Sequence, residues 1–284
     1  MSTIGGQFAA VNGHVGVRQW SIDEITEPAR YRASHFRNGT QRVAGIKDFT
    51  GSFTQELPHP ASTVMPGELF QFQGYTGPGT SVYGANGRVY DSGASGAIVD
   101  QVTITWSWSP GEPSIQTVVN FSNASSTGLT DSSTTAIADA GTEILPTICD
   151  LQIKTGTGVG TVWTNWTQAV LTISANNPST VNASTSCWRI RKPGPIDWTL
   201  SVTEDDDEQK LTIGTDYRIL LYTSATEYWE LLWGHLEGYT GLNVDIDSGA
   251  IISKTANFGM VSHNGTTLGS ITLPGAGAAW WPPT

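Results

Sequence analysis

The sequence predicts an all-β protein made of two tandem, duplicated β-sandwich or β-barrel domains that resemble each other. Three observations support this: the composition, the alternation of apolar and polar residues, and an internal repeat. Only 14% of the 284 residues are charged, well below the usual quarter, whereas 32 are glycine and 11 are tryptophan. No long run of Ala, Leu, Glu and Lys follows a helical period. Short strands joined by small-residue turns are therefore expected.

Alternation is clearest in VTITWSW, residues 102–108. Its valine, isoleucine and two tryptophans fall on one face of an extended strand, and its threonines and serine fall on the other. The segment DFTGSFT alternates in the same way and places Phe49, Gly51 and Phe53 on one face. Such a pattern is typical of a sheet with one buried and one wet face.

The repeat is centred on RVAGIKDFTGSFT, residues 42–54, which returns as RKPGPIDWTLSVT at 191–203. Six of the thirteen positions are identical: Arg42/Arg191, Gly45/Gly194, Asp48/Asp197, Thr50/Thr199, Ser52/Ser201 and Thr54/Thr203. Phe49 corresponds to Trp198. Gly45 and Gly194 stand just before the expected strands, where a turn favours a residue without Cβ.

Further matches occur in the same order along the chain. They are 27–34 with 177–184, 66–76 with 213–223, and 95–99 with 248–252, at offsets between 147 and 153 residues. We infer a tandem duplication, because loops tolerate the small changes in offset. The predicted domains are 1–125 and 143–284, the second with a C-terminal extension. Residues 126–142, which are small, polar and without apolar periodicity, form the predicted linker.

The charge balance argues against a protein that grips nucleic acid. The net charge is −11 and the isoelectric point is near 4.7, whereas phosphate binding requires a basic surface. Cys149 and Cys187 match no disulfide framework and no zinc spacing. The start of the chain lacks the pattern of a secretory signal, and no apolar run reaches the ~18 residues of a membrane span. A protein made in the cytoplasm, with no membrane partner, is expected.

The strongest catalytic candidate is DSGA, which occurs at 91–94 and 247–250. It resembles the paired loops of an aspartic protease, in which two carboxylates share a proton. Only 37 residues follow Asp247, too few to complete such a lobe, and a repeated β-turn is the preferred interpretation. The five histidines match no metal motif. We expect no enzyme activity, no cofactor and no metal.

Two further features were weighed against simpler interpretations. EDDDE at 204–208 lacks the spacing of a calcium loop and is expected to be a solvated hairpin tip. Most tryptophans lie in strand-like runs, where core packing explains them better than sugar stacking. Trp280-Trp281, near the C-terminus, could instead dock on a neighbour.

The order of these segments resembles the tail tube proteins of long-tailed bacteriophages. In the first half the matching residues are Gly16, Arg18, Trp20, Gly45, Asp48, Phe49, Gly51 and Gly111. The second half keeps Gly194, Asp197, Trp198 and Gly265, but it has no clear counterpart of the pattern at 16–20. The resemblance therefore covers nearly all of the first half and less of the second.

The resemblance implies a structural virion protein of the siphophage tail. Tube proteins of this family resemble β-barrels or sandwiches that join edge to edge into rings, and the rings stack into a hollow conduit for DNA ejection. A chain with two tube domains would form homotrimers, each a pseudo-hexameric ring. The implied partners are other copies of the chain, the tail terminator, distal tail and baseplate proteins, and the tape-measure protein and DNA, which pass through the lumen without specific binding.

The repeat and the resemblance together single out a candidate assembly motif. Its members are Arg42, Gly45, Asp48, Phe49, Arg191, Gly194, Asp197 and Trp198. Asp48 and Asp197 could line the bore or cap a turn. Alternatives to a tube subunit are another ring-forming tail protein, such as a terminator, distal tail or baseplate hub protein, and a glycan-binding virion module.

Overall fold

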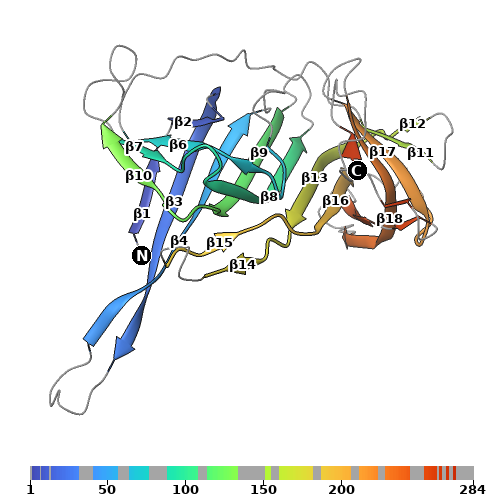
Figure 1. Cartoon of the computed structure of the whole chain (residues 1–284). Coiled ribbons are helices and arrows are strands. Elements are labelled where there is room, and N and C mark those ends of the chain that lie inside the picture. Colours follow the sequence, from blue (N-terminus) through green and yellow to red (C-terminus); the bar gives the residue numbers. More distant parts are fainter. Residues whose placement is uncertain are drawn as a thin grey trace. The chain divides into compact units, whose positions relative to one another are not determined.

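The computed structural model consists of β-strands and connecting segments, and no helix occurs among the residues it describes (Figure 1). These are residues 2–6, 8–12, 14–31, 41–56, 64–76, 88–107, 114–133, 151–154, 160–181, 187–205, 211–222, 228–243, 253–260, 262–263, 267–268 and 271–272. The prediction of an all-β fold is confirmed.

The chain divides into two compact units that exchange segments. Unit 1 comprises 1–102, 117–143 and 174–196, and unit 2 comprises 103–116, 144–173 and 197–284. The predicted domains, 1–125 and 143–284, are continuous in sequence and do not follow this division. Within the predicted linker 126–142, Thr130–Ser133 forms strand β10, because it pairs with β7 (Arg88–Asp91). Residues 134–142 lie outside the described part.

Unit 1 is organised around a long antiparallel hairpin. Its strands are β1 (Ser2–Gly6), β2 (Phe8–Val11), β3 (His14–Tyr31), β4 (Gln41–Glu56), β5 (Leu69–Phe70), β6 (Phe72–Tyr75), β7, β10, β14 (Ser179–Thr180) and β15 (Ile190–Arg191), with the first parts of β8 (Ala97–Ser107) and the last parts of β9 (Ser114–Asn123). β3 and β4 pair from Val17↔Gln55 to Tyr31↔Gln41. β1 and β2 pair with β3, β2 continues to β6, and β9 pairs with β4. Figure 1 shows the far end of the β3–β4 hairpin extending beyond the other strands of this unit.

The core of unit 1 is a cluster of aromatic rings. Phe49 and Phe53 of β4 are buried, as their alternation predicted, and so are Phe70, Phe72 and Phe121. The Phe121 ring lies at the centre, with its centroid 4.7 Å from that of Phe72 and 5.5 Å from that of Phe70. Gly51 lies between Phe49 and Phe53 on β4, and an ideal Cβ there would be 2.3 Å from the Phe121 ring. Glycine is therefore required at this position by packing.

Unit 2 is built around a long antiparallel sheet. The strands are residues 103–107 of β8, residues 114–116 of β9, β11 (Leu151–Lys154), β12 (Thr161–Val162), most of β13 (Trp166–Ala175), β16 (Ile196–Asp205) after its first residue, β17 (Asp216–Tyr222), β18 (Tyr228–Asn243), β19 (Ser253–Met260), β20 (Ser262–His263), β21 (Thr267–Leu268) and β22 (Ile271–Thr272). The ladder runs β12, β11, β17, β18, β19, β16, and β22 also pairs with β18.

β13 extends this sheet beyond β16 and also pairs with β8. The Asp205 N–H donates to the Asn165 carbonyl at 2.9 Å, just before β13 begins. Only residues 163–165 separate β12, at one end of the ladder, from β13 in the chain. Asn165 turns this corner with a φ of 63°, a conformation that asparagine tolerates better than most residues. The strand after this corner, β13, lies next to both β16 and β8, so the sheet continues past it.

The interior of unit 2 is lined by alternate residues of β16. Trp198, Leu200 and Val202 are buried, and Thr199 between them is exposed. The segment 102–107 of β8 alternates in the predicted way as well. Trp108 lies outside the described residues, as do Gly111, Gly265 and Trp280-Trp281.

Replacing Gly51 with alanine should destabilise unit 1 by about 1–3 kcal/mol, because the new methyl group overlaps a ring that neighbouring rings hold in place. Urea denaturation followed by tryptophan fluorescence measures the loss. The matched control is Gly238→Ala in β18, where an ideal Cβ would meet nothing within 4 Å, so that the change should stay within about 0.5 kcal/mol. Equal losses in both variants would contradict the packing role of Gly51.

Candidate assembly site

Asp48 is a strand residue on the face of β4 opposite to the aromatic core. Alternation places its neighbour Phe49 inward, so Asp48 would be exposed if nothing covered that face. Instead its side chain is only 5% exposed. The segment 187–191, which comes from the second half of the chain and belongs to unit 1, covers it.

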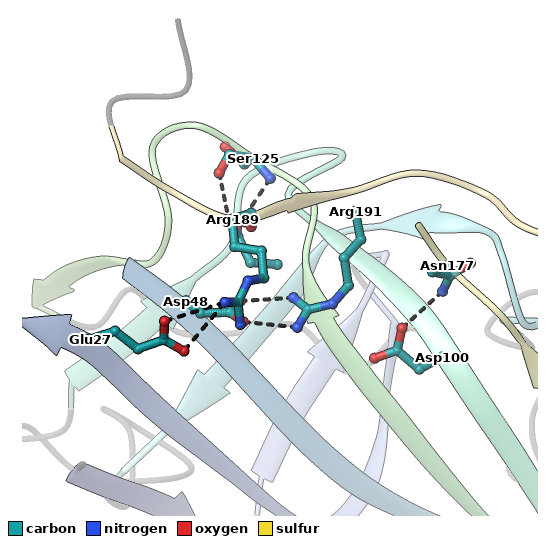
Figure 2. A network of polar contacts seen from close by, with 8 residues as sticks. Glu27, Asp48, Asp100, Ser125, Asn177, Arg189 and Arg191 are labelled. Carbon is teal, nitrogen blue, oxygen red and sulfur yellow. Dashed lines mark hydrogen bonds and ion pairs between the residues drawn. The ribbon is translucent and has the colours of Figure 1, made fainter. Parts of the chain in front are cut away.

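Two arginines of that segment converge on the Asp48 carboxylate (Figure 2). Arg191 donates from Nη1 to Oδ1 and from Nη2 to Oδ2, both at 2.8 Å, which is the two-point geometry that a guanidinium and a carboxylate favour. Arg189 donates from Nη1 to Oδ2 at 3.2 Å and reaches the exposed Glu27 of β3 with Nη2 at 3.3 Å. Asp48 thus accepts three hydrogen bonds, and its negative charge is neutralised.

The backbone of the same segment adds to the edge of β4. The Lys47 N–H donates to the Cys187 carbonyl at 2.8 Å, and the Arg189 N–H donates to the Lys47 carbonyl at 2.8 Å. These two bonds form a parallel bridge between Lys47 and Trp188. The Lys47 ammonium lies 5.6 Å from the centroid of the Trp188 ring. The buried Asn123 donates from Nδ2 to the Arg189 carbonyl at 2.7 Å.

The β14–β15 hairpin anchors the other end of the segment. Asn177 donates from Nδ2 to the Val99 carbonyl and to Asp100 Oδ1, both at 2.9 Å (Figure 2). An ideal Cβ on Gly194 would lie 1.8 Å from the Asn176 carbonyl oxygen, so only glycine allows the chain to pass there. Gly194 stands just before β16, as predicted, but this close approach and not a turn accounts for the glycine.

The electrostatics of this site favour a stable ion pair over a catalytic group. Burial acts to lower the pKa of Arg191, but hydrogen bonds and charge from Asp48, together with the charge of Asp100, raise it above its ordinary value. Both Asp48 oxygens are occupied by fixed donors. The cluster is therefore a clamp between two strands of different origin, and it offers no free base or nucleophile.

Of the eight predicted motif residues, the structure brings two together, Asp48 and Arg191, one from each copy of the repeat. Phe49 and Trp198 are buried in the cores of separate units. The predicted turn at Gly45 is wrong. Gly45 lies inside β4, at a register shift opposite Pro28, where the extra residues form a bulge. Arg42 also lies within β4, in register with Arg30.

Asp48 and Asp197, each expected either to line the bore or to cap a turn, have different environments. Asp48 does neither of the things predicted, because it is buried and paired within a strand. Asp197 is exposed, and its Oδ1 accepts the N–H of Trp198 at 2.8 Å at the start of β16. Sequence reasoning missed Arg189 and Glu27. The only signal was that Arg189 and Arg191, two residues apart, must share a face of any extended segment.

The first DSGA sequence forms the predicted turn. The Asp91 carboxylate accepts hydrogen bonds from Gln71, Gln73 and the Gly93 N–H, and the Gly96 N–H closes the turn by donating to the Gly93 carbonyl at 3.1 Å. Burial, and secondly the charge of Asp91, raises the pKa of Tyr75 to about 12. The second DSGA sequence lies outside the described residues.

Glu204, the first residue of EDDDE, corrects the prediction of a solvated tip at that position. Its side chain is 1% exposed, and its Oε1 lies 2.9 Å from the Lys254 ammonium directly opposite on β19. Its other oxygen accepts a hydrogen bond from the Trp163 indole N–H. Strand β16 continues through Asp205, so alternation turns Glu204 inward with Val202 and Leu200. The following three acidic residues lie outside the described part.

The described residues offer neither a metal site nor a membrane-spanning helix. They contain no group of three or more His, Cys, Asp or Glu side chains placed to hold a metal ion. They also contain no helix long and apolar enough to span a membrane. The chain matches no protein-family model, and comparison with curated proteins finds no similar sequence.

Replacing Asp48 with asparagine should destabilise unit 1 by about 1–3 kcal/mol, because two guanidinium groups lose a charged acceptor in a covered site. Urea denaturation measures the change. The matched control is Asp197→Asn, the same substitution at the other copy of the repeat, where the exposed carboxylate makes the expected loss about 0.5 kcal/mol or less. A loss at Asp48 no greater than at Asp197 would refute the clamp.

Replacing Glu204 with glutamine should destabilise unit 2 by about 3–5 kcal/mol, because it takes the opposite charge away from a buried ammonium. Glu204→Gln combined with Lys254→Met should recover most of this loss, since it removes the ammonium whose counter-charge is gone and leaves an amide oxygen to accept the Trp163 N–H. Thermal and urea denaturation of the single and double variants test the pair. A double variant as unstable as the single one would show that Glu204 stabilises unit 2 by other means.

Proposed function

We propose that the chain is the tube subunit of a bacteriophage tail, a structural protein whose rings stack into a hollow conduit for DNA. The observation that carries the proposal is the repeated strand motif. Both copies form strands, and each buries its aromatic residue in an all-β unit, Phe49 in unit 1 and Trp198 in unit 2. A chain with the same strand twice is suited to three subunits making a pseudo-hexameric ring.

The charge of the chain supports a conduit that lets DNA pass. The net charge of −11 makes the chain as a whole repel a DNA duplex. Phosphate contacts would add affinity and slow the movement of DNA through the tube, so a conduit is expected to lack them. Closing sheets into a ring would also cover strand edges that would otherwise promote uncontrolled aggregation. The expected partners are other copies of the chain, the tape-measure protein, and the proteins at the two ends of the tail.

The polar clusters support a structural role over catalysis. Among the described residues, several donors hold the carboxylates of Asp48 and Asp91. The buried carboxylates of Glu204 and Glu230 each pair with a cation, Lys254 and Arg218 respectively. A general base needs an accessible lone pair near a substrate. We therefore propose no enzyme activity for this chain.

A glycan-binding module is less well supported. Six of the tryptophans are buried, and they are Trp20, Trp106, Trp163, Trp166, Trp198 and Trp229. A sugar-stacking surface requires exposed ring faces, and only Trp188 and Trp233 among the described tryptophans are half-exposed.

A ring-forming terminator, distal tail or hub protein would use the same fold and differs in whether its rings stack.

Negative-stain electron microscopy of the purified chain over a range of concentrations tests the proposal. Stacked hollow rings with a three-fold modulation of a six-fold outline are the expected result. Single rings that never stack would favour a terminator or hub protein. Monomers at every concentration, together with binding on a glycan array, would overturn the tube proposal in favour of a glycan-binding module.

A further inference from the structure

The repeat equates two hairpins that belong to different halves of the chain. By the offset of 149 to 150 residues, the far end of the β3–β4 hairpin, 27–46, corresponds to 177–195, which contains β14 and β15. Both segments form antiparallel pairs: Arg30↔Arg42 in the first and Ser179↔Arg191 in the second. The corresponding positions pair to within one residue, so the two hairpins occupy the same place in their repeats.

The second hairpin belongs to unit 1, although it arises from the second half of the chain. It is held there by the clamp between Arg191 and Asp48. Both residues of this clamp are among the six identities of the repeat. Their counterparts are Arg42, on the first hairpin, and Asp197, at the start of β16.

The counterpart carboxylate is not used in the same way. Asp48 is buried under two arginines, whereas Asp197 is exposed and forms no ion pair with any described residue. Its one recorded hydrogen bond comes from the next residue's N–H. The first hairpin, meanwhile, extends beyond the other strands of unit 1 (Figure 1). One half of the repeat thus has a clamp on a buried carboxylate, whereas the corresponding carboxylate of the other half, Asp197, is exposed and forms no ion pair with a described residue.

We propose that Arg42 of one copy of the chain pairs with Asp197 of a second copy, and that this pair repeats between chains the clamp that Arg191 and Asp48 form within one chain. The inference rests on the proposed ring. In a closed ring of tandem subunits, junctions within a chain alternate with junctions between chains. If the two kinds of junction are equivalent, the first hairpin of each chain docks on the second-half sheet of its neighbour.

The chemistry of the pair suits a contact that forms late. Asp197 stays solvated until a partner arrives, so the isolated chain bears no buried uncompensated charge. A guanidinium can then engage the carboxylate through two hydrogen bonds, as Arg191 engages Asp48 at 2.8 Å. Such a pair fixes the register of the docking hairpin as well as adding attraction. The contact is heterologous, joining different surfaces, which is the type that closes into rings.

Charge-reversal variants of the full chain test the pair. Arg42→Asp and Asp197→Arg, each alone, should raise the concentration needed for ring formation by about 100-fold or more, since a matched charge pair becomes a like-charge clash. The double variant, which restores the pair with its direction reversed, should recover most of the assembly. Sedimentation velocity and negative-stain microscopy give the assembled fraction. Glu237→Lys, a reversal at another exposed acidic residue of unit 2, is the control and should assemble normally.

The outcomes separate this inference from the proposed function. Rings that form normally in Asp197→Arg, or a double variant no better than either single one, would overturn the Arg42–Asp197 pair and leave the tube proposal standing. A wild-type chain that stays monomeric at every concentration and binds on a glycan array would overturn both. Unfolding curves for Asp197→Arg should match the wild type, because the side chain is exposed, and loss of assembly with an unchanged curve supports the intermolecular contact.

Discussion

Unit 1 depends on how the charge of Asp48 is neutralised. A carboxylate on a covered strand face is costly unless charged donors meet it, and here the donors come from a segment of the second half of the chain. Once Arg189 and Arg191 are in place, the backbone bridge to Lys47 and the bonds from Asn123 and Asn177 complete the edge of the sheet. The clamp therefore fixes the strand pairing that the aromatic core alone would leave open.

The two units use buried charge in different ways. In unit 1 the clamp joins segments far apart in sequence, at the edge of a sheet, and part of it remains in contact with water. In unit 2 the Glu204–Lys254 pair joins neighbouring strands β16 and β19 within one sheet. The first determines which segment covers β4. The second fixes the alignment of two strands, since a slip by one residue would move either charge to the opposite face.

Much of the fold could be predicted from alternation, because the side-chain period of a strand is two whatever its surroundings. The burial of Phe49, Phe53, Trp198 and Val202 followed directly. The same rule, extended two residues past Val202, places Glu204 on the inward face. The run of acidic residues at 204–208 instead suggested a solvated hairpin tip. The bulge at Gly45 and the pairing of Asp48 with Arg191 could not be predicted, because they depend on which strands are neighbours. A repeat shows that two segments are alike, and it does not show that one contacts the other.

The exchange of segments between the units has a consequence for synthesis on the ribosome. The carboxylate of Asp48 and the guanidinium of Arg191 are 143 residues apart in the chain, so the first half emerges long before its clamp exists. Unit 1 cannot reach its final state until residues 174–196 have left the exit tunnel. The two units are thereby obliged to mature together, and a chain released early would present an unfinished sheet edge to quality control.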